Sequence, residues 1–453
     1  MQSSHSYIYI YINEILGIVR WQKWSTWFLG YRGSGVLVKE KEQVKVKAKI
    51  GSVMASCTVL FKIILVLLSL SDSAVHVLSL SFGINYGQIA NNLPSPSRVS
   101  VLLQTLNVSR VKLYDADPNV LQAFSNSQVD FIIGLGNENL QNMKDPLKAQ
   151  AWIQQHVQPH LPQTKITCIT VGNEILGGND TQLMSNLLPA MQSVHGALVD
   201  LGLSKQVTVT TAHSLTILGN SYPPSSGSFR QDLAQYIQPI LSFHAQVNSP
   251  FLINAYPYFA YKDNPGEVPL EYVLFQPNSG MVDSVTNLHY DNMLDAQIDA
   301  VYAAIKAMGH TDVEVRISET GWPSKGDPNE AGATPENAGL YNGNLMRKLE
   351  ERKGTPAKPS VPIDIYVFAL FNEDLKPGPA SERNYGLYYP DGTPVYDIGF
   401  KGYLPQLIFT ADSNKNNVLS IFNFLIFLTL QHMHEEFLKI FPGQKEFYSL
   451  TAE

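Results

Sequence analysis

Two glutamates follow strand-like stretches of the sequence in the same way. In "VRISETGWPS", residues 315 to 324, a β-rich run reaches Glu319 and is followed by the turn-forming letters "TGWP". In "ITCITVGNEILGG", residues 166 to 178, apolar and β-branched residues lead to Glu174 and then to two glycines. Because apolar runs lead directly into both glutamates, a solvated surface position explains neither well. The repeated pattern predicts that the two carboxyl groups act as a pair.

A pair of carboxyl groups, one protonated and one ionised, is suited to cleaving a glycosidic bond. Two like charges in a confined site raise the pKa of the less well stabilised group, which lets the pair divide the two roles. Carboxyl groups roughly 5 to 5.5 Å apart give retention of configuration, and roughly 6.5 to 9.5 Å gives inversion. Sequence spacing leaves both outcomes open. The sequence has no Asp/His cluster at metal-ligand spacing and no Ser-His pair, so neither metal chemistry nor a serine nucleophile is indicated. We therefore expect no metal and no cofactor.

Eight short apolar or β-branched runs alternate with helix-like segments. The runs begin at residues 81, 110, 130, 166, 207, 250, 313 and 363. Segments between them, such as "TQLMSNLLPAMQSVHGALVDLGL", repeat apolar residues at the 3.6-residue period of a helix. Strands joined by crossover helices are parallel. Eight such units over roughly 320 residues predict an α/β fold, a (β/α)8 TIM barrel that forms a single catalytic domain. No glycine-rich dinucleotide motif follows the first strand.

The barrel would bring the two glutamates together. In such barrels the loops at the carboxyl ends of the strands build the active site. Glu174 would end the fourth strand and Glu319 the seventh, so both carboxyl groups would face one shared site. Glycines after both glutamates relax the backbone limits at these strand exits, and Pro323 fixes the departing chain.

The composition is that of an ordinary globular protein. The 453 residues are 44% hydrophobic and 16% charged, with a formal net charge of −7. Lys and Arg form no basic stripe after the first fifty residues, which argues against a nucleic-acid partner and favours an uncharged substrate. Cys168 lies in an apolar strand without a neighbouring His or Lys, which predicts a buried thiol and not a nucleophile. We expect a monomer.

The two ends of the chain resemble targeting segments. Residues 1–53 form an atypical extension that a gene-model artefact would explain, and residues 54–81 have the charged start and short apolar run of a secretory signal peptide. The catalytic domain is expected at 82–403. Residues 404–453 contain an imperfect glycosylphosphatidylinositol (GPI) anchor signal, and an amphipathic or unstructured extension explains them equally well.

These segments predict where the protein works. A signal peptide implies secretion to the extracellular space or cell wall, and a GPI anchor would attach the protein to the plasma membrane. In a secreted chain, the Asn-x-Ser/Thr sequons at Asn107 and Asn179 are candidate glycosylation sites.

Six stretches of the sequence resemble plant endo-1,3-β-glucanases of glycoside hydrolase family 17. They are "FGINYG", "VKLYDAD", "TVGNE", "NAYPYF", "ISETGWPS" and "FALFNEDLKPGPASERNYGLYYPDG". The resemblance covers nearly all of residues 82–403, and the "SETGWPS" match is highly specific. It implies retaining endo-hydrolysis of 1,3-β-glucosidic linkages in callose-like or laminarin-like glucans. Glu319 would be the nucleophile and Glu174 the acid/base.

The resemblance also implies residues that support catalysis. Asn173 would hydrogen-bond near the sugar 2-hydroxyl, a contact that strengthens in the transition state. A charged network in the loop after the last strand would hold the geometry and charge of the nucleophile: Glu373, Lys376 and Glu382. A solvated loop explains these three residues about equally well.

Aromatic residues at the strand ends are suited to contact sugars, because they combine a flat apolar face with a polar edge. The candidates for substrate binding are Tyr86, Tyr114, Tyr256, Tyr258 and Trp322. For each residue alone, core packing is an equally good explanation. The match to the family positions favours sugar contact most for Tyr86, Tyr258 and Trp322.

The sequence departs from the family pattern at Arg316, where the family usually has an apolar residue. Arg316 and Glu314 lie two positions apart and would share one strand face, so they would pair with each other or with a helix. This departure leaves the catalytic assignment in place and concerns only how the strand packs. His213 and His289 are interpreted as structural or loop residues.

Three alternative functions remain. Hydrolysis of mixed-linkage 1,3-1,4-β-glucan and transfer to another glucan would use the same carboxylates, and the sequence does not separate them from 1,3-β-glucan hydrolysis. A non-catalytic, wall-associated glucan-binding protein would be expected to lack the nucleophile or the acid. Both glutamates are present.

Overall fold

The computed structural model describes residues 82–106 and 108–398. The predicted N-terminal extension, signal peptide and C-terminal extension therefore lie outside the described residues, as do Asn107 and the last few residues of the predicted catalytic domain. Within the described part, no helix is long and apolar enough to cross a membrane.

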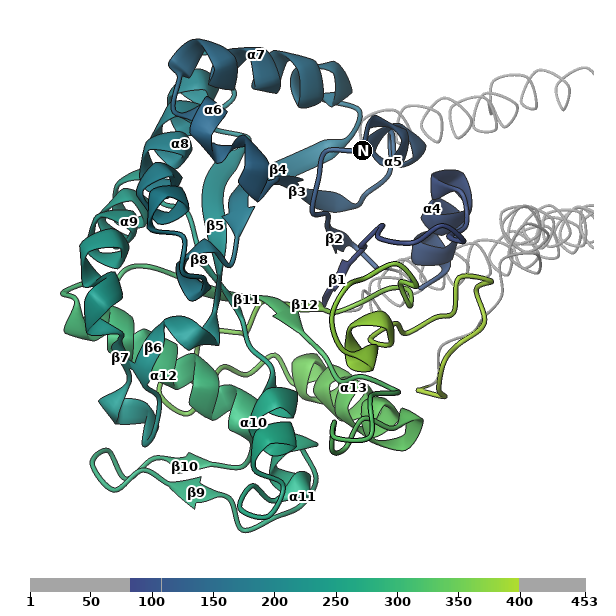
Figure 1. The fold of residues 1–453 in the computed structure, drawn as a ribbon, viewed down its shortest axis with the longest axis vertical. Coiled ribbons are helices and arrows are strands. Elements are labelled where there is room, and N and C mark those ends of the chain that lie inside the picture. Colours follow the sequence, from purple (N-terminus) through teal and green to yellow (C-terminus); the bar gives the residue numbers. More distant parts are fainter. Residues whose placement is uncertain (1–81, 107, 399–453) are drawn as a thin grey trace, which may run out of the picture. The chain divides into compact units, whose positions relative to one another are not determined.

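Eight strands close into a barrel, which confirms the predicted fold (Figure 1). Around the barrel their order is β1-β12-β11-β8-β5-β4-β3-β2, and every pair that the register describes is parallel. The strands are β1 (Gly83–Asn85), β2 (Arg110–Lys112), β3 (Asp130–Leu135), β4 (Lys165–Asn173), β5 (Thr208–Ser214), β8 (Phe251–Asn254), β11 (Val315–Thr320) and β12 (Ile365–Val367).

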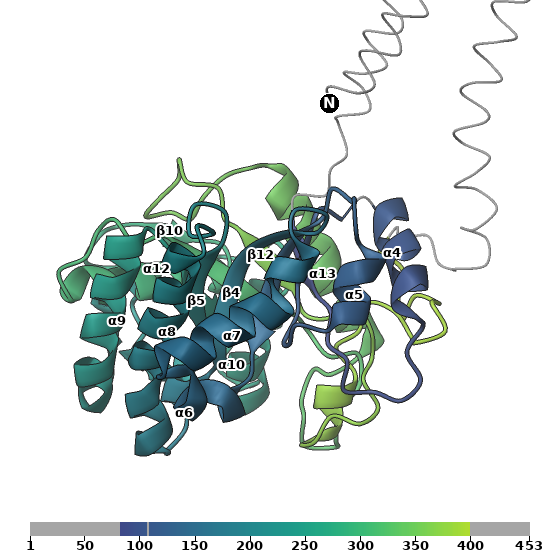
Figure 2. The same ribbon diagram turned by 90° about the horizontal axis from the view of Figure 1, so that it is seen from above.

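Helices surround the strands, as Figures 1 and 2 show from two directions. The longer ones are α4 (Pro96–Thr105), α7 (Pro146–His156), α8 (Thr181–Asp200), α9 (Ala234–Val247), α12 (Met293–Ala307) and α13 (Pro335–Glu350). In α8, residues three or four apart, Leu187, Met191, Val194 and Leu198, are fully buried. Such a stripe turns one face of the helix to the barrel. The side chain of Asp180 caps this helix by accepting a hydrogen bond from the backbone of Leu183 at 2.9 Å.

Shorter elements lie in the loops between the strands and the long helices. They are the helices α5 (Pro118–Ala123), α6 (Leu140–Met143), α10 (Pro257–Asp263) and α11 (Leu270–Val273) and two small antiparallel sheets, β6 (Leu218–Asn220) with β7 (Ser228–Phe229) and β9 (Met281–Val282) with β10 (His289–Tyr290).

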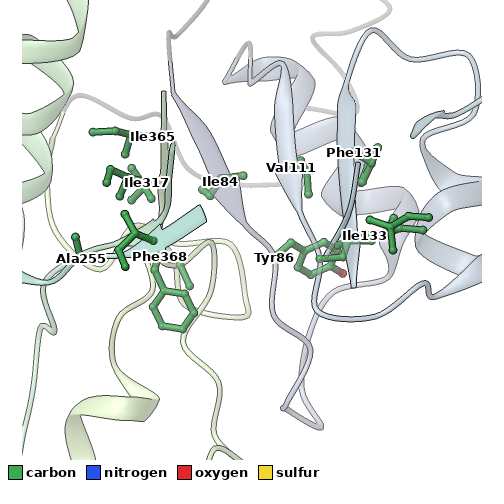
Figure 3. Close-up of a cluster of buried hydrophobic side chains, with 14 of the residues drawn as sticks. Ile84, Tyr86, Val111, Phe131, Ile133, Ala255, Ile317, Ile365 and Phe368 are labelled. Carbon is green, nitrogen blue, oxygen red and sulfur yellow. The ribbon is translucent and has the colours of Figure 1, made fainter. Parts of the chain in front are cut away.

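Most of the hydrophobic core lies on one face of the barrel strands. Figure 3 shows buried side chains of this core, among them Ile84, Val111 and Phe131. These three residues are register partners on neighbouring strands, and partners of this kind point to the same face of a sheet. The next row in the register, one residue further along each strand, therefore points to the opposite face.

That next row is polar at one end. Its members are Asn85, Lys112, Ile132 and Cys168, which are register partners on β1 to β4. All four are buried. Cys168 lies beside Ile132 and Tyr366 in a small separate cluster, and burial raises the pKa of its thiol to about 11. The prediction that Cys168 is a buried thiol is confirmed.

The structure resolves the packing of Arg316. Its Nε donates to Glu314 Oε1 at 2.8 Å and its terminal nitrogen donates to Glu314 Oε2 at 3.0 Å. Its Nε also lies 3.4 Å from Oδ2 of Asp364, which precedes β12. The sequence left open whether Arg316 and Glu314 pair with each other or with a helix. In the structure they pair with each other, Arg316 lying in β11 and Glu314 directly before it.

Both histidines that the sequence analysis interpreted as structural are placed accordingly. His213 is fully buried in β5 and stacks on Phe251, with 4.6 Å between the ring centroids. His289 lies at the start of β10, where its Nε2 is 3.0 Å from the carbonyl oxygen of Ser279.

Candidate active site

The strand register brings Glu174 and Glu319 to the same end of the barrel. Glu319 lies in β11 as the register partner of Asn254, the last residue of β8. Glu174 directly follows the last residue of β4, and its backbone N–H donates to the carbonyl of Ala212 in β5 at 2.8 Å. The strands β5 and β8 are the neighbours that separate β4 from β11.

Asn254 connects the two glutamates. Its Nδ2 donates to Oε1 of Glu174 at 2.8 Å. Its Oδ1 accepts from the hydroxyl of Ser318, the residue before Glu319, at 2.6 Å. Because the hydroxyl occupies the amide oxygen, the amide nitrogen is turned toward the carboxyl group of Glu174. One side chain thus fixes the orientation of Glu174 relative to the strand that carries Glu319.

Glu319 is held by one cation and two phenols. It is 6% exposed. Its Oε1 accepts from Lys112 Nζ at 3.0 Å and from the Tyr114 hydroxyl at 2.7 Å, and its Oε2 accepts from the Tyr256 hydroxyl at 2.9 Å. Burial alone would favour the neutral acid, but the charge of Lys112 and the hydrogen bonds from Tyr114 and Lys112 outweigh it and lower the pKa of Glu319. These contacts favour the ionised form of Glu319.

The pKa of Glu174 is shifted in the opposite direction to that of Glu319. Burial, followed by the negative charge of Glu319, raises its pKa above the ordinary value, and the hydrogen bond from Asn254 only partly offsets this. Its backbone is left-handed, with φ 56° and ψ 26°, a conformation that is uncommon for a residue with a side chain. The two environments separate the pKa values in the way that an acid and a nucleophile require.

The charged residues of the loop after β12 lie near this pair. Glu373 is buried, and its Oε1 accepts from the backbone N–H of Ile89 at 2.8 Å. Lys376 Nζ lies 3.9 Å from Glu382 Oε2 and 4.2 Å from the centroid of the Phe368 ring. Burial is the main cause that raises the pKa of both Glu373 and Glu382. The three predicted supporting residues therefore form a partly buried charged group, not a solvated loop.

The aromatic candidates fall into two groups. Tyr114 and Tyr256 are partly exposed, and their hydroxyls bond to Glu319. Tyr86, Tyr258 and Trp322 are at most 1% exposed.

The buried group packs in the core and presents no ring face to a sugar. Tyr86 meets Phe371 edge-on, with 6.2 Å between the ring centroids. Tyr258 meets Trp322 edge-on at 5.1 Å, and Trp322 Nε1 donates to the carbonyl of Gly332 at 2.8 Å. The expectation that these three residues bind substrate is corrected here, because close packing covers both faces of each ring.

Several residues of the site were not identified from the sequence. They are Asn85, Lys112, Asn137, Asn254 and Ser318. Lys112 gave the clearest signal, since a lysine in the apolar run "RVKLYD" is buried at a cost unless a carboxylate pairs with it. Asn254 ends the apolar run "FLIN" as the glutamates end theirs. Within residues 82–106 and 108–398, no group of three or more His, Cys, Asp or Glu side chains is arranged to hold a metal ion.

Comparisons with known proteins agree with this arrangement. The sequence model of the family "Glycosyl hydrolases family 17" matches residues 82–400. Among curated proteins, glucan endo-1,3-beta-glucosidase 14 of Arabidopsis thaliana is 66% identical over 377 residues, which cover 83% of this chain and 95% of the relative. Glucan endo-1,3-beta-glucosidase 11 of the same plant is 61% identical over 339 residues, which cover 74% of this chain and 80% of the relative.

Two solved structures are also similar. One is CJP38, a beta-1,3-glucanase and allergen of Cryptomeria japonica pollen, with a TM-score of 0.68, 38% identity, and coverage of 71% of this chain and 99% of the other. The other belongs to a pair of plant beta-glucan endohydrolases with distinct substrate specificities, with a TM-score of 0.65, 37% identity, and coverage of 70% and 100%.

Proposed function

The chain belongs to glycosyl hydrolases family 17, and on that premise we propose that it hydrolyses internal 1,3-β-glucosidic linkages of β-1,3-glucans with retention of configuration. The observation that carries the proposal is the meeting of Glu319 and Glu174 at one end of the barrel, where Lys112 and two tyrosine hydroxyls bond to Glu319 and Asn254 bonds to Glu174. The opposite pKa shifts of the two carboxyl groups agree with this assignment. The relatives named above, with their glucan endo-1,3-beta-glucosidase activity, support the choice of substrate.

In the first step, the ionised Glu319 attacks the anomeric carbon while the protonated Glu174 gives its proton to the departing glycosidic oxygen. Lys112 and the two tyrosine hydroxyls bond to both carboxylate oxygens of Glu319 and fix its orientation before substrate arrives. Such preorganisation lowers the cost of reaching the transition state.

The second step reverses the proton transfer. Formation of the glycosyl ester removes the negative charge of Glu319, which is one of the causes that raise the pKa of Glu174. The pKa of Glu174 therefore falls in the intermediate, and its carboxylate can take a proton from the water that attacks the ester. The charge of one residue thus sets the role of the other.

Asn173 is proposed to bind the sugar next to the cleaved bond. Its Oδ1 is buried and has no hydrogen-bond partner among the described residues, whereas its backbone is fully engaged. A buried acceptor without a partner is costly. A sugar hydroxyl, such as the 2-hydroxyl, would satisfy it.

Glu373, Lys376 and Glu382 are proposed to tune the field around the nucleophile. The charge of Lys376 contributes to the lowered pKa of Glu319, while Glu319 contributes to the raised pKa of Glu373 and of Glu382. The charges of this group and of Glu319 therefore shift one another's pKa values. Tyr114 and Tyr256 are proposed to contact substrate as well, because their rings are partly exposed beside Glu319.

We also propose that the protein is secreted to the cell wall after removal of a signal peptide, with the catalytic domain at 82–403. Asn179 supports this proposal because it is exposed in the loop before α8, where a glycan could be attached. Mass spectrometry of the mature protein would identify both termini, any GPI anchor and any glycan in one experiment. An intact residue 1 and an unmodified Asn179 would contradict secretion.

Release of reducing sugar from laminarin tests the proposed activity. The wild type and Glu319→Gln are compared on laminarin and on mixed-linkage β-glucan, and the anomer released first is followed by proton NMR. We expect release from laminarin with a β-anomer first and a loss of at least about 1000-fold in the variant. Activity that survives in the variant would refute the mechanism. Preference for mixed-linkage glucan, or products longer than the substrate, would favour the alternative enzymes, and no release would favour a binding protein.

A further inference from the structure

An asparagine side chain from the next strand loop holds the backbone before Glu174. Asn137 begins the 3-10 turn η3 (Asn137–Asn139), which follows β3. Its Oδ1 accepts from the backbone N–H of Asn173 at 2.8 Å, and its Nδ2 donates to the backbone carbonyl of Asn173 at 3.0 Å. One side-chain amide therefore satisfies both backbone groups of the residue that precedes Glu174.

These two hydrogen bonds extend the ladder between β3 and β4. The last register pair of the two strands is Leu135 with Val171, two residues before Asn173. A primary amide carries a donor and an acceptor side by side, as a peptide group does. The side chain of Asn137 thus takes the place of a strand residue beyond the point where the backbone of β3 has turned away.

The backbone needs this support because it leaves the ordinary strand conformation at this point. Gly172 has φ 70° and Glu174 has φ 56°. A left-handed residue with a side chain persists only where its surroundings hold it. A Cβ on Gly172 would lie 3.1 Å from Asn137 Oδ1, so glycine also gives the amide room to approach. On the other side, the N–H of Glu174 bonds to Ala212.

We propose that Asn137 is a positioning residue for the general acid, and that it governs proton donation by Glu174 and not the attack by Glu319. The inference rests on the proposed function, because it assigns a role within that reaction. Asn137 acts through the backbone of Asn173, which sets the direction in which the side chain of Glu174 leaves the chain. The contacts that hold Glu319 come from elsewhere. Lys112 lies in β2, Tyr114 follows β2 and Tyr256 follows β8.

Two substrates separate these roles. Laminarin has a leaving group that needs a proton, whereas a 2,4-dinitrophenyl glycoside of a 1,3-β-glucan oligosaccharide has a leaving group that departs without one. The ratio kcat/KM reports the glycosylation step for both. For Asn137→Ala we expect a loss of about tenfold to a hundredfold on laminarin and less than about threefold on the dinitrophenyl glycoside.

Two reference variants show what loss of the acid and loss of the nucleophile look like on these substrates. Glu174→Gln should show the same selectivity more strongly, and Glu319→Gln should lose both activities. Asn139→Ala is the matched control, because Asn139 lies in the same turn and its side chain donates to Glu138 at 2.8 Å. This control should behave as the wild type on both substrates. An equal loss on both substrates for Asn137→Ala, or no loss, overturns the proposal.

A second variant covers the case in which Asn137→Ala does not fold. Asn137→Asp keeps an acceptor for the N–H of Asn173 and adds a negative charge near Glu174, which raises the pKa of that acid. Asn137→Asp also loses the donor to the Asn173 carbonyl, so kcat/KM on laminarin should fall while cleavage of the dinitrophenyl glycoside stays within about threefold of the wild type, and the alkaline limb on laminarin should move to higher pH. An equal loss on both substrates overturns the proposal. If the wild type cleaves neither substrate, the proposed function itself fails, a result distinct from any pattern among the variants.

Discussion

Replacing Lys112 with methionine tests how strongly a buried cation fixes the ionisation of Glu319. Lys112 is 1% exposed, and its Nζ lies 3.0 Å from Glu319 Oε1. Methionine fills a similar volume without the charge, so the buried carboxylate keeps the phenol hydrogen bonds and the electrostatic influence of Lys376 but loses its direct cation. Removing one partner of a buried ion pair costs about 3 to 5 kcal/mol of folding free energy.

The geometry supports the upper part of that range. Two unit charges at this separation attract by about 5 kcal/mol at an effective dielectric constant of about 20. With an unfolding entropy of about 2.1 cal/mol/K per residue over roughly 300 residues, a loss of about 3 to 5 kcal/mol lowers Tm by about 5 to 8 °C.

The loss has a definite dependence on pH. In the wild type the folded-state pKa of Glu319 is lowered, so its ionised form stabilises the fold above the unfolded-state pKa, and this contribution disappears as pH falls through the folded-state pKa. In the Lys112 variant burial acts without the cation and raises the pKa of Glu319. The destabilisation is then largest near neutral pH and shrinks in acid, where Glu319 takes up a proton. The acid limb of kcat/KM moves to higher pH, because the nucleophile must be ionised.

Calorimetry at pH 7 and pH 4, together with a pH profile of laminarin hydrolysis, measures both effects. Lys165→Met is the matched control, since Lys165 also pairs with a strand carboxylate, Asp130 at 2.5 Å, but its side chain is 48% exposed. An exposed pair is worth about 1 kcal/mol or less. The reasoning is refuted if the Tm loss of Lys112→Met is the same at both pH values, or if the acid limb stays in place.

Three further predictions follow from the same contacts. Tyr256→Phe removes a hydrogen bond of 2.9 Å to the Glu319 carboxylate, so kcat/KM on laminarin should fall about tenfold or more near the acid limb; an unchanged pH profile contradicts this. Burial lowers the pKa of His213 to about 3, so as pH falls below the unfolded-state value the unfolded chain takes up the proton first, and stability drops by roughly 1.4 kcal/mol per pH unit. His213→Leu should therefore lose less Tm than the wild type between pH 6 and pH 4, and parallel Tm curves would count against it. A Cβ on Gly87 would lie 2.5 Å from both carboxylate oxygens of Glu373, so Gly87→Ala should displace that buried side chain from the Ile89 N–H and lower both laminarin hydrolysis and Tm; full activity would argue against a role for Glu373.

The fold and the catalytic pair could be predicted from the sequence because both depend on simple periodicity. Eight β-rich runs separated by helical spacing leave few alternatives to a barrel. Once the strands are parallel, any residue that ends one of them lies at the same end as the others. Glu174 and Glu319 needed no further information to be paired.

The surroundings of the pair could not be predicted in the same way. Tyr256 and Tyr258 are two positions apart in "NAYPYF", yet Tyr256 bonds to Glu319 while Tyr258 packs on Trp322. Helix α10 begins between them, at Pro257, and turns the two rings to different sides. Residue type says only that a tyrosine suits either place. Packing on the neighbouring elements decides which ring faces the site.

The supporting contacts were missed for a related reason. The charged residues after β12 could be predicted because they match a family pattern, whereas the direct cation on Glu319 is Lys112, the last residue of an ordinary strand, β2. Asn137 bonds to the backbone of Asn173, 36 positions further along the chain, and no local sequence pattern predicts this hydrogen bond. Contacts of this kind depend on register, which only the closed sheet defines.

The closure of the barrel between β1 and β12 has a consequence for synthesis. Gly83 is the register partner of Tyr366, and Ile84 of Val367, so the ring is completed by nearly the last strand to leave the ribosome. A nascent chain that has reached only β11 carries Glu174 and Glu319 but still exposes the edge of β1, whose unpaired backbone groups invite association with other chains. We expect growing chains to need protection by chaperones until β12 emerges, and fragments that stop before Ile365 to be recovered as aggregates.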